Sequence, residues 1–547
     1  MTPQRARERP DSPAISAWGG DLTYRQLDQL PYRLAYQLVE IGIRPDVIVP
    51  LYFGKPMWMP VSVVAVMKAG GAGVMIDSTQ PIERVRSMIS QVDANVILVL
   101  RDNAHHATHF EGVKHLVVDQ ASVDALPDFE AAISLQNAVQ PSNIVYVSFS
   151  SGSTEKPKGA FGHAFRVFDF ASYAFDVGWS NLFQLTSGGC LCISSEYQRR
   201  NTLEDSLRES KATLLDATPS VLRHLDPEKL PDLEHVIMSG EPWSEEDFGN
   251  WIDKKKVMNS YGPQECTVKA SLVRVVRGMA PNTIGVGLGL NTWVVRTDGS
   301  DLLAPVGSVG ELRLEGPQVA RGYIADEARS AASSVRAQRR LGFFVGRRDS
   351  QVKIRGQRTE LGEVEYYIQK ALPGGDLRTQ VVAEVFKPQK SDNAILVAFL
   401  KADRDELWHK LAGINERLAN LIPEYMIPMA YISIDEFLVT TTGKIHRMCL
   451  RETYAEKTLE QLIAFDVLHM SCHRAPTSAS ERLLQELLAE ISGIGPEAIS
   501  AEDSFLRVGG DSLGAMRLVG ALRTRGFGLI FTDIFQQPQA QGSCETH

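Results

Sequence analysis

Apolar positions in the first third of the chain alternate between helical and extended spacing. One set recurs every three or four residues, as on a single helix face: Leu27, Leu30, Leu34, Leu38 and Ile41. Thr23 has the side chain of a helix N-cap just before this set. Residues 61–69 are again apolar at helical spacing, and short β-rich runs of strand length follow at 74–76, 95–100, 115–118 and 144–149. Helices alternating with such strands predict an α/β fold with a mostly parallel sheet.

The later part of the chain changes character twice. Runs at 174–177, 191–193 and 236–238 continue the first pattern, whereas 310–314, 319–323 and 351–356 alternate in twos and predict β-ribbons. A strand at 394–399 and a helix at 406–421 then predict a smaller α+β unit. Weak periodicity at 455–478 is typical of a linker. Two amphipathic helices, at 480–491 and from 512 to about 523, predict a small helical domain. We therefore expect domain bounds of 1–348, 349–455, 456–478 (linker) and 479–541.

Composition narrows the class of protein. A chain of 547 residues is long enough for about three domains. The net charge of -9 comes without a basic run, so nucleic acid is not a favoured partner. No apolar stretch reaches the ~18 residues of a membrane span, and residues 1–10 lack the apolar segment of a secretory signal. Six cysteines without paired spacing indicate a reducing compartment, so we expect a cytoplasmic protein in which Cys190 and Cys192 are core thiols.

A loop rich in hydroxyl groups follows the apolar run at 144–149. Its candidate phosphate-binding residues are Ser150, Ser151, Gly152, Ser153, Thr154, Lys158 and Gly159. Hydroxyls, bare backbone N–H groups and lysine ammonium groups together suit an anion. The loop is not a Walker sequence, because its two glycines are seven residues apart and no Lys-Ser/Thr pair follows the second. The alternative is an ordinary surface loop.

The loop Ser-Gly-Ser-Thr-x-Lys-Pro-Lys-Gly resembles the phosphate loop of the adenylate-forming enzymes. Further segments in the same order resemble an adenylation domain followed by a peptidyl carrier domain of a non-ribosomal peptide synthetase. They occur at residues 22–24, 68–70, 175–176, 261–265, 310–312, 319–323, 346–356, 421–428, 442–447 and 509–512. The resemblance runs from Leu22 to about Gln537. It implies a large adenylate-forming domain (1–348), its small C-terminal subdomain (349–455) and a helical carrier domain (479–541).

This resemblance implies two half-reactions that use ATP, Mg²⁺ and 4'-phosphopantetheine. An amino acid becomes an aminoacyl adenylate and then passes to the thiol of a pantetheine arm. Lys444 would bridge the amino acid carboxylate and ATP, Tyr261 and Glu265 would bind ATP with Glu265 holding Mg²⁺, and Asp349 would be the hinge of the small subdomain. The alternatives are a solvated surface lysine and an ordinary turn aspartate.

The resemblance also assigns a substrate pocket. Its positions here are Asp176, Val177, Ser180, Asp216, Ile237, Ser239, Ser260, Val268, Lys269 and Lys444. Asp176 would pair with the substrate α-amine, its alternative role being a helix cap. We expect Asp216 and Lys269 to pair with each other, since lone buried charges are costly. The pocket does not translate into one amino acid.

Ser512 stands at the predicted start of the last helix, after Gly509-Gly-Asp511. It resembles the serine to which phosphopantetheine is attached, so the partners implied are a phosphopantetheinyl transferase and condensation or other synthetase domains acting in trans. The alternative for Ser512 is an ordinary N-cap serine.

The chain departs from the family pattern at four places. Glu155 replaces a glycine of the phosphate loop, the aspartate that holds the ribose is absent before Gly346, residues 158–175 are short, and the carrier lacks its usual last helix. These changes predict weak adenylation. One alternative is therefore a degenerate module that at most carries a pantetheine arm. A second alternative is a stand-alone acyl-CoA ligase, but such an enzyme would not explain Asp176 or the domain that contains Ser512.

Overall fold

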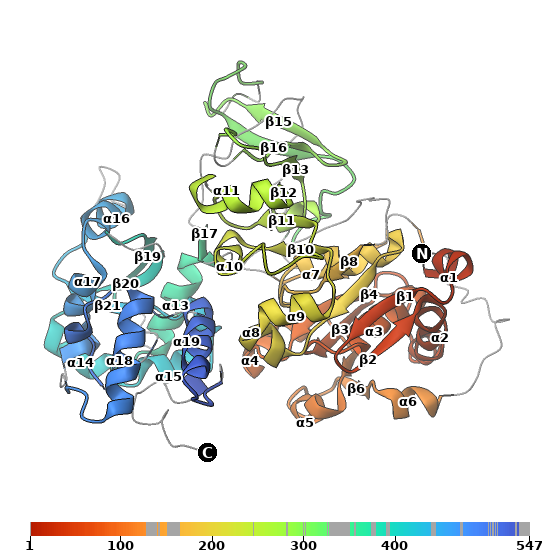
Figure 1. Cartoon of the computed structure of the whole chain (residues 1–547), viewed down its shortest axis with the longest axis horizontal. Coiled ribbons are helices and arrows are strands. Elements are labelled where there is room, and N and C mark those ends of the chain that lie inside the picture. The colour runs from red at the N-terminus through yellow and green to blue at the C-terminus, as the bar shows by residue number, and fades with distance from the viewer. Residues whose placement is uncertain are drawn as a thin grey trace. The chain divides into compact units, whose positions relative to one another are not determined.

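The computed structural model of the protein contains two compact units, each described here by itself (Figure 1). The first comprises residues 1–199 and 203–345; the second comprises 346–547 together with Arg200–Thr202. The structure describes residues 2–126, 139–140, 143–149, 165–243, 245–280, 283–298, 300, 302–324, 327, 351–354, 357–373, 379–389, 394–438, 445–470, 474–501, 503, 505, 508, 510, 512–530 and 533–534.

A five-stranded parallel sheet, in the order β6-β5-β3-β4-β7, lies in the first unit. Its strands are β3 (Ile48–Phe53), β4 (Ala72–Asp77), β5 (Val96–Val99), β6 (Lys114–Val117) and β7 (Tyr146–Val147). Leu51, Tyr52 and Phe53 are consecutive and all fully buried, so both faces of β3 are covered, as parallel sheets require. The predicted parallel sheet is confirmed, although β7 is shorter than the apolar run that predicts it.

Helix α2 (Tyr24–Glu40) shows why the helical spacing was a reliable signal. The Thr23 hydroxyl accepts a hydrogen bond from the Gln26 N–H (3.3 Å), and the Gln26 side chain accepts one from the Thr23 N–H (2.8 Å). This capping box satisfies N–H groups that a helix start leaves open. The helix buries its predicted apolar face, and α3 (Trp58–Lys68) is buried almost throughout. The remaining helices of this part are α1 (Thr2–Glu8), α4 (Ile82–Gln91), α5 (Ala104–Ala107) and α6 (Gln120–Asp124).

A nine-stranded sheet, in the order β14-β13-β12-β11-β10-β8-β9-β1-β2, is the second sheet of this unit. Its six inner strands, β12 to β1, pair in parallel, and the outer strands pair antiparallel. The bounds are β1 (Pro13–Ala17), β2 (Gly20–Thr23), β8 (Arg166–Phe168), β9 (Cys190–Ile193), β10 (Leu214–Ala217), β11 (His235–Ser239), β12 (Lys256–Tyr261), β13 (Ser271–Arg274) and β14 (Val286–Gly287). Cys190 and Cys192 are buried, free thiols of β9, as predicted.

Two sequence predictions in this unit are wrong. Residues 174–177 form a turn into helix α7 (Val177–Phe183) rather than continuing the strand pattern, and the strand of this region is β8. Residues 319–323 form no strand: β15 (Asn291–Val295) and β16 (Glu311–Glu315) pair with each other, and the chain then turns. Gly322 has a φ of +142°, which an extended strand does not permit. The other helices are α8 (Glu196–Asn201), α9 (Leu203–Glu209), α10 (Pro219–Leu222) and α11 (Glu245–Lys254).

The second unit contains the predicted α+β subdomain. Its ribbon, β17 (Gln351–Ile354) with β18 (Gln357–Glu360), leads to α13 (Leu361–Ala371) and the sheet β19-β20-β21. The sheet strands are β19 (Val381–Phe386), β20 (Ile395–Lys401) and β21 (Ala430–Ile434). The single helix expected at 406–421 is wrong. It is broken into α14 (Arg404–Leu411) and α15 (Ile414–Ala419) because Gly413 adopts a left-handed φ of +67° between them.

The segment predicted to be a linker is partly folded. After α16 (Arg447–Ala455), residues 456–478 contain α17 (Leu459–Phe465), whose start is closed by a capping box at Thr458. Leu459, Leu462 and Ile463 are buried. A seven-residue helix offers too few turns for a periodic signal, which is why the sequence pattern missed it.

The small helical domain is built on α18 (Ala479–Ser492) and α19 (Ser512–Thr524), as predicted. Ser478 caps α18 through a capping box with Glu481. Leu484, Leu487 and Leu488 of α18 are buried, as are several residues of α19: Ala515, Leu518, Val519 and Leu522. Among the residues that the structure describes, no helix is both long and apolar enough to cross a lipid bilayer.

Burial in the β19-β20-β21 sheet makes a stability prediction. Phe399 is fully buried on β20, so Phe399→Ala should remove about 3–5 kcal/mol of stability. For a unit of this size, the loss corresponds to a fall of roughly 10 °C in its calorimetric melting temperature. Phe465→Ala is the matched control, since Phe465 is 43% exposed on α17 and should cost about 1 kcal/mol or less. Equal shifts from both substitutions would contradict this assignment of the core.

Candidate functional site

Polar side chains gather where three neighbouring parallel strands end. Asp216 lies near the end of β10, Ser239 ends β11, and Ser260 is next to last in β12. The strand register pairs Asp216 with Ile237 and Ser239 with Ser260, so four of the predicted pocket residues come from one edge of the sheet. Open α/β sheets bind their ligands at the carboxyl ends of the strands. This edge is therefore the candidate binding site.

An ion pair lies at this edge. Lys269 Nζ donates to Asp216 Oδ2, and the Ser239 hydroxyl donates to Asp216 Oδ1 at 3.3 Å. The Asp216 side chain is 1% exposed and that of Lys269 is 13% exposed. The predicted pairing of these two charges is confirmed. The pair thus joins a buried carboxylate to a partly buried ammonium, and the two charges cancel each other.

The loop after β12 holds strained backbone. Thr267 and Val268 both have left-handed φ angles, +56° and +66°, which a β-branched residue rarely adopts. Gly262 makes the loop possible, because a Cβ at this position would lie 2.1 Å from the Val268 carbonyl oxygen. The Thr267 hydroxyl donates to the Gln318 carbonyl (2.8 Å), and the Ala270 N–H donates to the Tyr261 carbonyl (2.9 Å). Such strain is stored at functional sites more often than elsewhere.

Glu265 lies in the same loop, half-buried. Its Oε1 accepts a hydrogen bond from the Tyr323 hydroxyl at 3.0 Å, and its carbonyl accepts one from the Ala320 N–H at 3.0 Å. Within the described part of the chain, no three His, Cys, Asp or Glu side chains are grouped to hold a metal ion. Mg²⁺ commonly takes one or two carboxylates and completes its shell with phosphate oxygens and water. A single oriented carboxylate such as Glu265 therefore fits Mg²⁺ that arrives with ATP.

Asp176 lies at the N-cap position of α7, yet its carboxylate makes no capping hydrogen bond to the helix. Its carbonyl instead accepts from the Trp179 and Ser180 N–H groups, at 2.9 and 3.4 Å. Asp176 is half-buried, and Ser180, four residues on, lies on the same side of the helix. Trp179 anchors the helix by stacking on Tyr146, with ring centroids 4.5 Å apart. The carboxylate of Asp176 therefore does not cap the helix, which removes the structural alternative for this residue.

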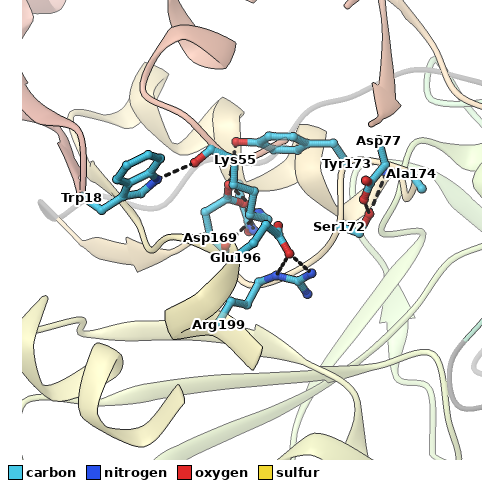
Figure 2. A network of polar contacts seen from close by, with 10 residues as sticks. Trp18, Lys55, Asp77, Asp169, Ser172, Tyr173, Ala174, Glu196 and Arg199 are labelled. Atoms are coloured by element: carbon cyan, nitrogen blue, oxygen red, sulfur yellow. Dashed lines mark hydrogen bonds and ion pairs between the residues drawn. The ribbon is translucent and has the colours of Figure 1, made fainter. Parts of the chain in front are cut away.

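A buried polar network precedes α7 and was missed by sequence reasoning (Figure 2). Lys55 donates to the Asp169 carboxylate at 2.8 Å, and so does the Tyr173 hydroxyl at 2.8 Å. Asn181 donates to the other carboxylate oxygen at 3.1 Å. Lys55 and Asp169 are 114 residues apart in the chain, so neither spacing nor motif joined them. A lysine before a proline and an aspartate in an apolar run were the available signals.

Several predicted site residues lie outside the described residues: Ser150, Ser151, Gly152, Ser153, Thr154, Lys158, Gly159, Asp349 and Lys444. Three residues beyond Lys444, Arg447 opens α16 and donates to two carboxylates, Glu384 at 3.0 Å and Glu365 at 2.6 Å. Burial raises the pKa of Glu384, and Arg447 opposes that shift.

Ser512 is the first residue of α19, so it lies at the start of a helix, as predicted.

Comparison with known proteins gives two family matches. Residues 2–324 match the AMP-binding enzymes, and residues 482–545 match the family described as the phosphopantetheine attachment site. The chain is 39% identical to nonribosomal peptide synthetase ungA of Aspergillus violaceofuscus, over 98% of this chain and 6% of that protein. It is 37% identical to peramine synthetase ppzA of Metarhizium majus, over 98% of this chain and 21% of that protein. The chain thus spans a small part of the length of these relatives.

The alignment with the first of these relatives is 596 positions long, more than the 547 residues of the chain, so the relative has residues where this chain has none. Among solved structures, the fold is similar to holo-PA1221, an NRPS protein containing adenylation and PCP domains. The TM-score is 0.71 at 20% identity, over 99% of this chain and 94% of that one. The fused adenylation–PCP didomain NpsA-ThdA of Klebsiella oxytoca is similar at a TM-score of 0.65 and 19% identity, over 79% of this chain and 92% of that one.

The Asp216–Lys269 pair makes a prediction about charge balance. Lys269→Met leaves a buried carboxylate without its cation, which should cost about 3–5 kcal/mol of stability. The double variant Asp216→Leu/Lys269→Met should recover most of that loss, because an apolar pair of similar volume leaves no unpaired charge. Thermal unfolding of wild type, both single variants and the double variant forms the cycle. A double variant no more stable than Lys269→Met would contradict the pairing.

Proposed function

Because the chain belongs to the AMP-binding enzymes, with the adenylation and carrier domains of a non-ribosomal peptide synthetase, we propose that it activates an amino acid and loads it onto its own carrier domain. In the first step a carboxylate oxygen of the amino acid attacks the α-phosphorus of ATP. The bond from that phosphorus to the oxygen of the β-phosphate breaks, and pyrophosphate leaves. In the second step the pantetheine thiolate attacks the acyl carbon, and AMP leaves.

The observation that supports this proposal most strongly is that both families match one chain in the same order as in a didomain. Residues 2–324 would supply the adenylate, and residues 482–545 would supply the acceptor arm. A stand-alone acyl-CoA ligase would need no carrier domain. A non-catalytic remnant is a weaker explanation, because similarity to synthetases extends over 98% of the chain. The domain bounds that we propose remain 1–348, 349–455 and 479–541.

Each residue of the site would act mainly through charge and position. The reacting carboxylate and triphosphate repel each other, so cations and fixed geometry lower the barrier. Asp176 would hold the substrate ammonium, Lys444 would bridge carboxylate and phosphate, and Glu265 would hold Mg²⁺ beside the phosphates. The hydroxyl loop of residues 150–159 would bind the triphosphate. Asp349 would be the hinge about which the small subdomain turns between the two half-reactions.

Partners follow from the same chemistry. A phosphopantetheinyl transferase would attach the arm to Ser512, and condensation or other synthetase domains would consume the loaded amino acid. The relatives are several times longer than this chain, which supports further domains as partners. We propose a cytoplasmic location, where ATP and coenzyme A are available and cysteines such as Cys190 and Cys192 stay reduced.

Pyrophosphate exchange with a panel of amino acids tests the first step. We expect ATP–pyrophosphate exchange that depends on one amino acid or a small group of them, and that is slow because of Glu155 and the absent ribose-binding aspartate. Lys444→Ala should lower the exchange rate about 100-fold or more, because its charge acts in the transition state. Its melting temperature should stay within a few degrees of wild type, which separates chemistry from folding. No exchange with any amino acid would favour the degenerate module, in keeping with Glu155 and the absent ribose-binding aspartate.

Attachment of the arm tests the carrier separately. After incubation with coenzyme A and a promiscuous transferase, the intact mass of the protein should rise by one phosphopantetheine. Ser512→Ala should abolish the increase, whereas Ser478→Ala, which alters only a helix cap of the same domain, should still accept the arm. An unmodified wild type, or a modified Ser512→Ala variant, would contradict the assignment.

A further inference from the structure

The carboxylate of Asp169 collects donors from three parts of the first unit. Lys55, which follows β3, donates at 2.8 Å to Oδ2 and at 2.8 Å to the Asp169 carbonyl. Tyr173 donates to Oδ2 at 2.8 Å, and Asn181 of α7 donates to Oδ1 at 3.1 Å. Figure 2 shows Lys55, Asp169 and Tyr173 turned toward one another between these segments. Both ends of the stretch 169–181 are thus fastened to a single carboxylate.

The network is dry and its charges are balanced. The Lys55 side chain is 2% exposed and that of Asp169 is 1% exposed. Burial lowers the pKa of Lys55, and the adjacent Asp169 carboxylate opposes that shift. The Lys55 ammonium also lies 4.3 Å from the centre of the Tyr173 ring. The backbone carbonyl of Lys55 accepts a hydrogen bond from the Trp18 indole N–H at 2.9 Å. Removing either charged partner would leave the other as a buried charge without compensation.

A second tether holds the middle of the same stretch. The Ser172 hydroxyl donates to Asp77 Oδ2, at the end of β4. The other Asp77 oxygen is fixed by the Thr79 hydroxyl and N–H, at 2.7 and 2.9 Å. The Ser172 oxygen in turn accepts from the Ala174 N–H at 3.2 Å. The chain from 169 to 181 is therefore pinned from β3, from β4 and from its own helix.

The stretch 169–181, which this network holds, contains residues of the proposed substrate pocket. Asp176, Val177 and Ser180, three of the proposed pocket residues, all lie between Asp169 and Asn181. We propose that the Lys55–Asp169 pair is a positioning element of the substrate pocket, which sets the place of Asp176 against the substrate ammonium. This inference rests on the proposed function. Neither Lys55 nor Asp169 is a catalytic residue in it, since each acts through the segment that it holds.

The pair has an electrostatic consequence as well. The stretch 169–181 contains two carboxylates, Asp169 and Asp176. Lys55 neutralises the first, which is 1% exposed, so Asp169 is not available to a second cation. A substrate ammonium then has one partner here rather than two. Its position, and with it the direction of the attached carboxylate, is defined.

The matched control is a second lysine–aspartate pair in the same unit. Lys68 donates to Asp28 at 2.8 Å and lies over the Tyr32 ring at 3.4 Å, so it repeats the lysine, carboxylate and ring of the network. It joins α2 to α3 rather than to the stretch 169–181. Asp28→Leu therefore removes a similar interaction from another place. Asp169→Leu removes both acceptor oxygens, whereas Asp169→Asn keeps the shape and one acceptor oxygen but loses the negative charge.

Steady-state exchange kinetics and hydrogen exchange test the proposal together. Asp169→Leu should raise KM for the amino acid tenfold or more and leave KM for ATP within twofold, and Asp169→Asn, which keeps one acceptor oxygen, should raise the amino acid KM by less than Asp169→Leu does. Amide protection should fall for peptides within 170–181 and stay elsewhere. Tyr173→Phe, which removes one hydrogen bond, should raise the amino acid KM about threefold and serves if Asp169→Leu fails to fold. Asp28→Leu should neither raise the amino acid KM nor lower the amide protection of residues 170–181.

Equal changes of the two KM values, or the same profile from Asp28→Leu, would overturn the proposal. A wild type that activates no amino acid would instead contradict the proposed function. Hydrogen exchange then decides the positioning role alone. Protection lost only within 170–181, in Asp169→Leu and not in Asp28→Leu, supports it; unchanged protection overturns it.

Discussion

A carboxylate cannot be buried in a folded chain without a cation or several donors beside it, and this constraint governs the arrangement of the first unit. Asp169 is surrounded by Lys55, Tyr173 and Asn181, and Asp216 by Lys269 and Ser239. Each cluster joins segments that are far apart in the sequence. A buried polar cluster with unsatisfied groups destabilises the fold more than an apolar core would. Each cluster therefore also fixes the backbone segments whose side chains form it.

In the proposed substrate pocket, the two clusters would serve different parts. The Asp216 cluster lies at the carboxyl ends of β10 and β11, where the parallel sheet directs its polar residues. The Asp169 cluster lies before α7 and holds the stretch that carries Asp176, a residue of the proposed pocket. The strained turn at Thr267 and Val268 follows Glu265 in the loop after β12, and the absence of a Cβ at Gly262 leaves room for it. Rigid positioning of this kind is what a reaction between two anionic groups requires.

Local patterns in the sequence identified most of the fold. Helix α2 with its cap at Thr23, the parallel strands and the pair of helices α18 and α19 each have a signal that lies within a few neighbouring residues. The errors arose where the backbone turns within a favourable residue pattern, as at Gly413, whose left-handed φ splits a predicted helix, and at residues 316–319, where bends and turns follow β16 in place of the predicted ribbon. Side-chain charge predicted the Asp216–Lys269 pair once the family resemblance had aligned the two positions. The Lys55–Asp169 pair had no such guide, because only the tertiary structure brings β3 and β8 to the same carboxylate.

Loading of an amino acid onto the chain's own carrier domain is the decisive experiment. Holo protein, with its arm on Ser512, would be incubated with ATP, Mg²⁺ and a pool of amino acids, and its intact mass recorded. We predict a gain of one aminoacyl group that requires ATP, is absent from Ser512→Ala and is released by hydroxylamine, as expected of a thioester. A holo protein that stays unacylated with every amino acid, while its arm is present, would contradict it.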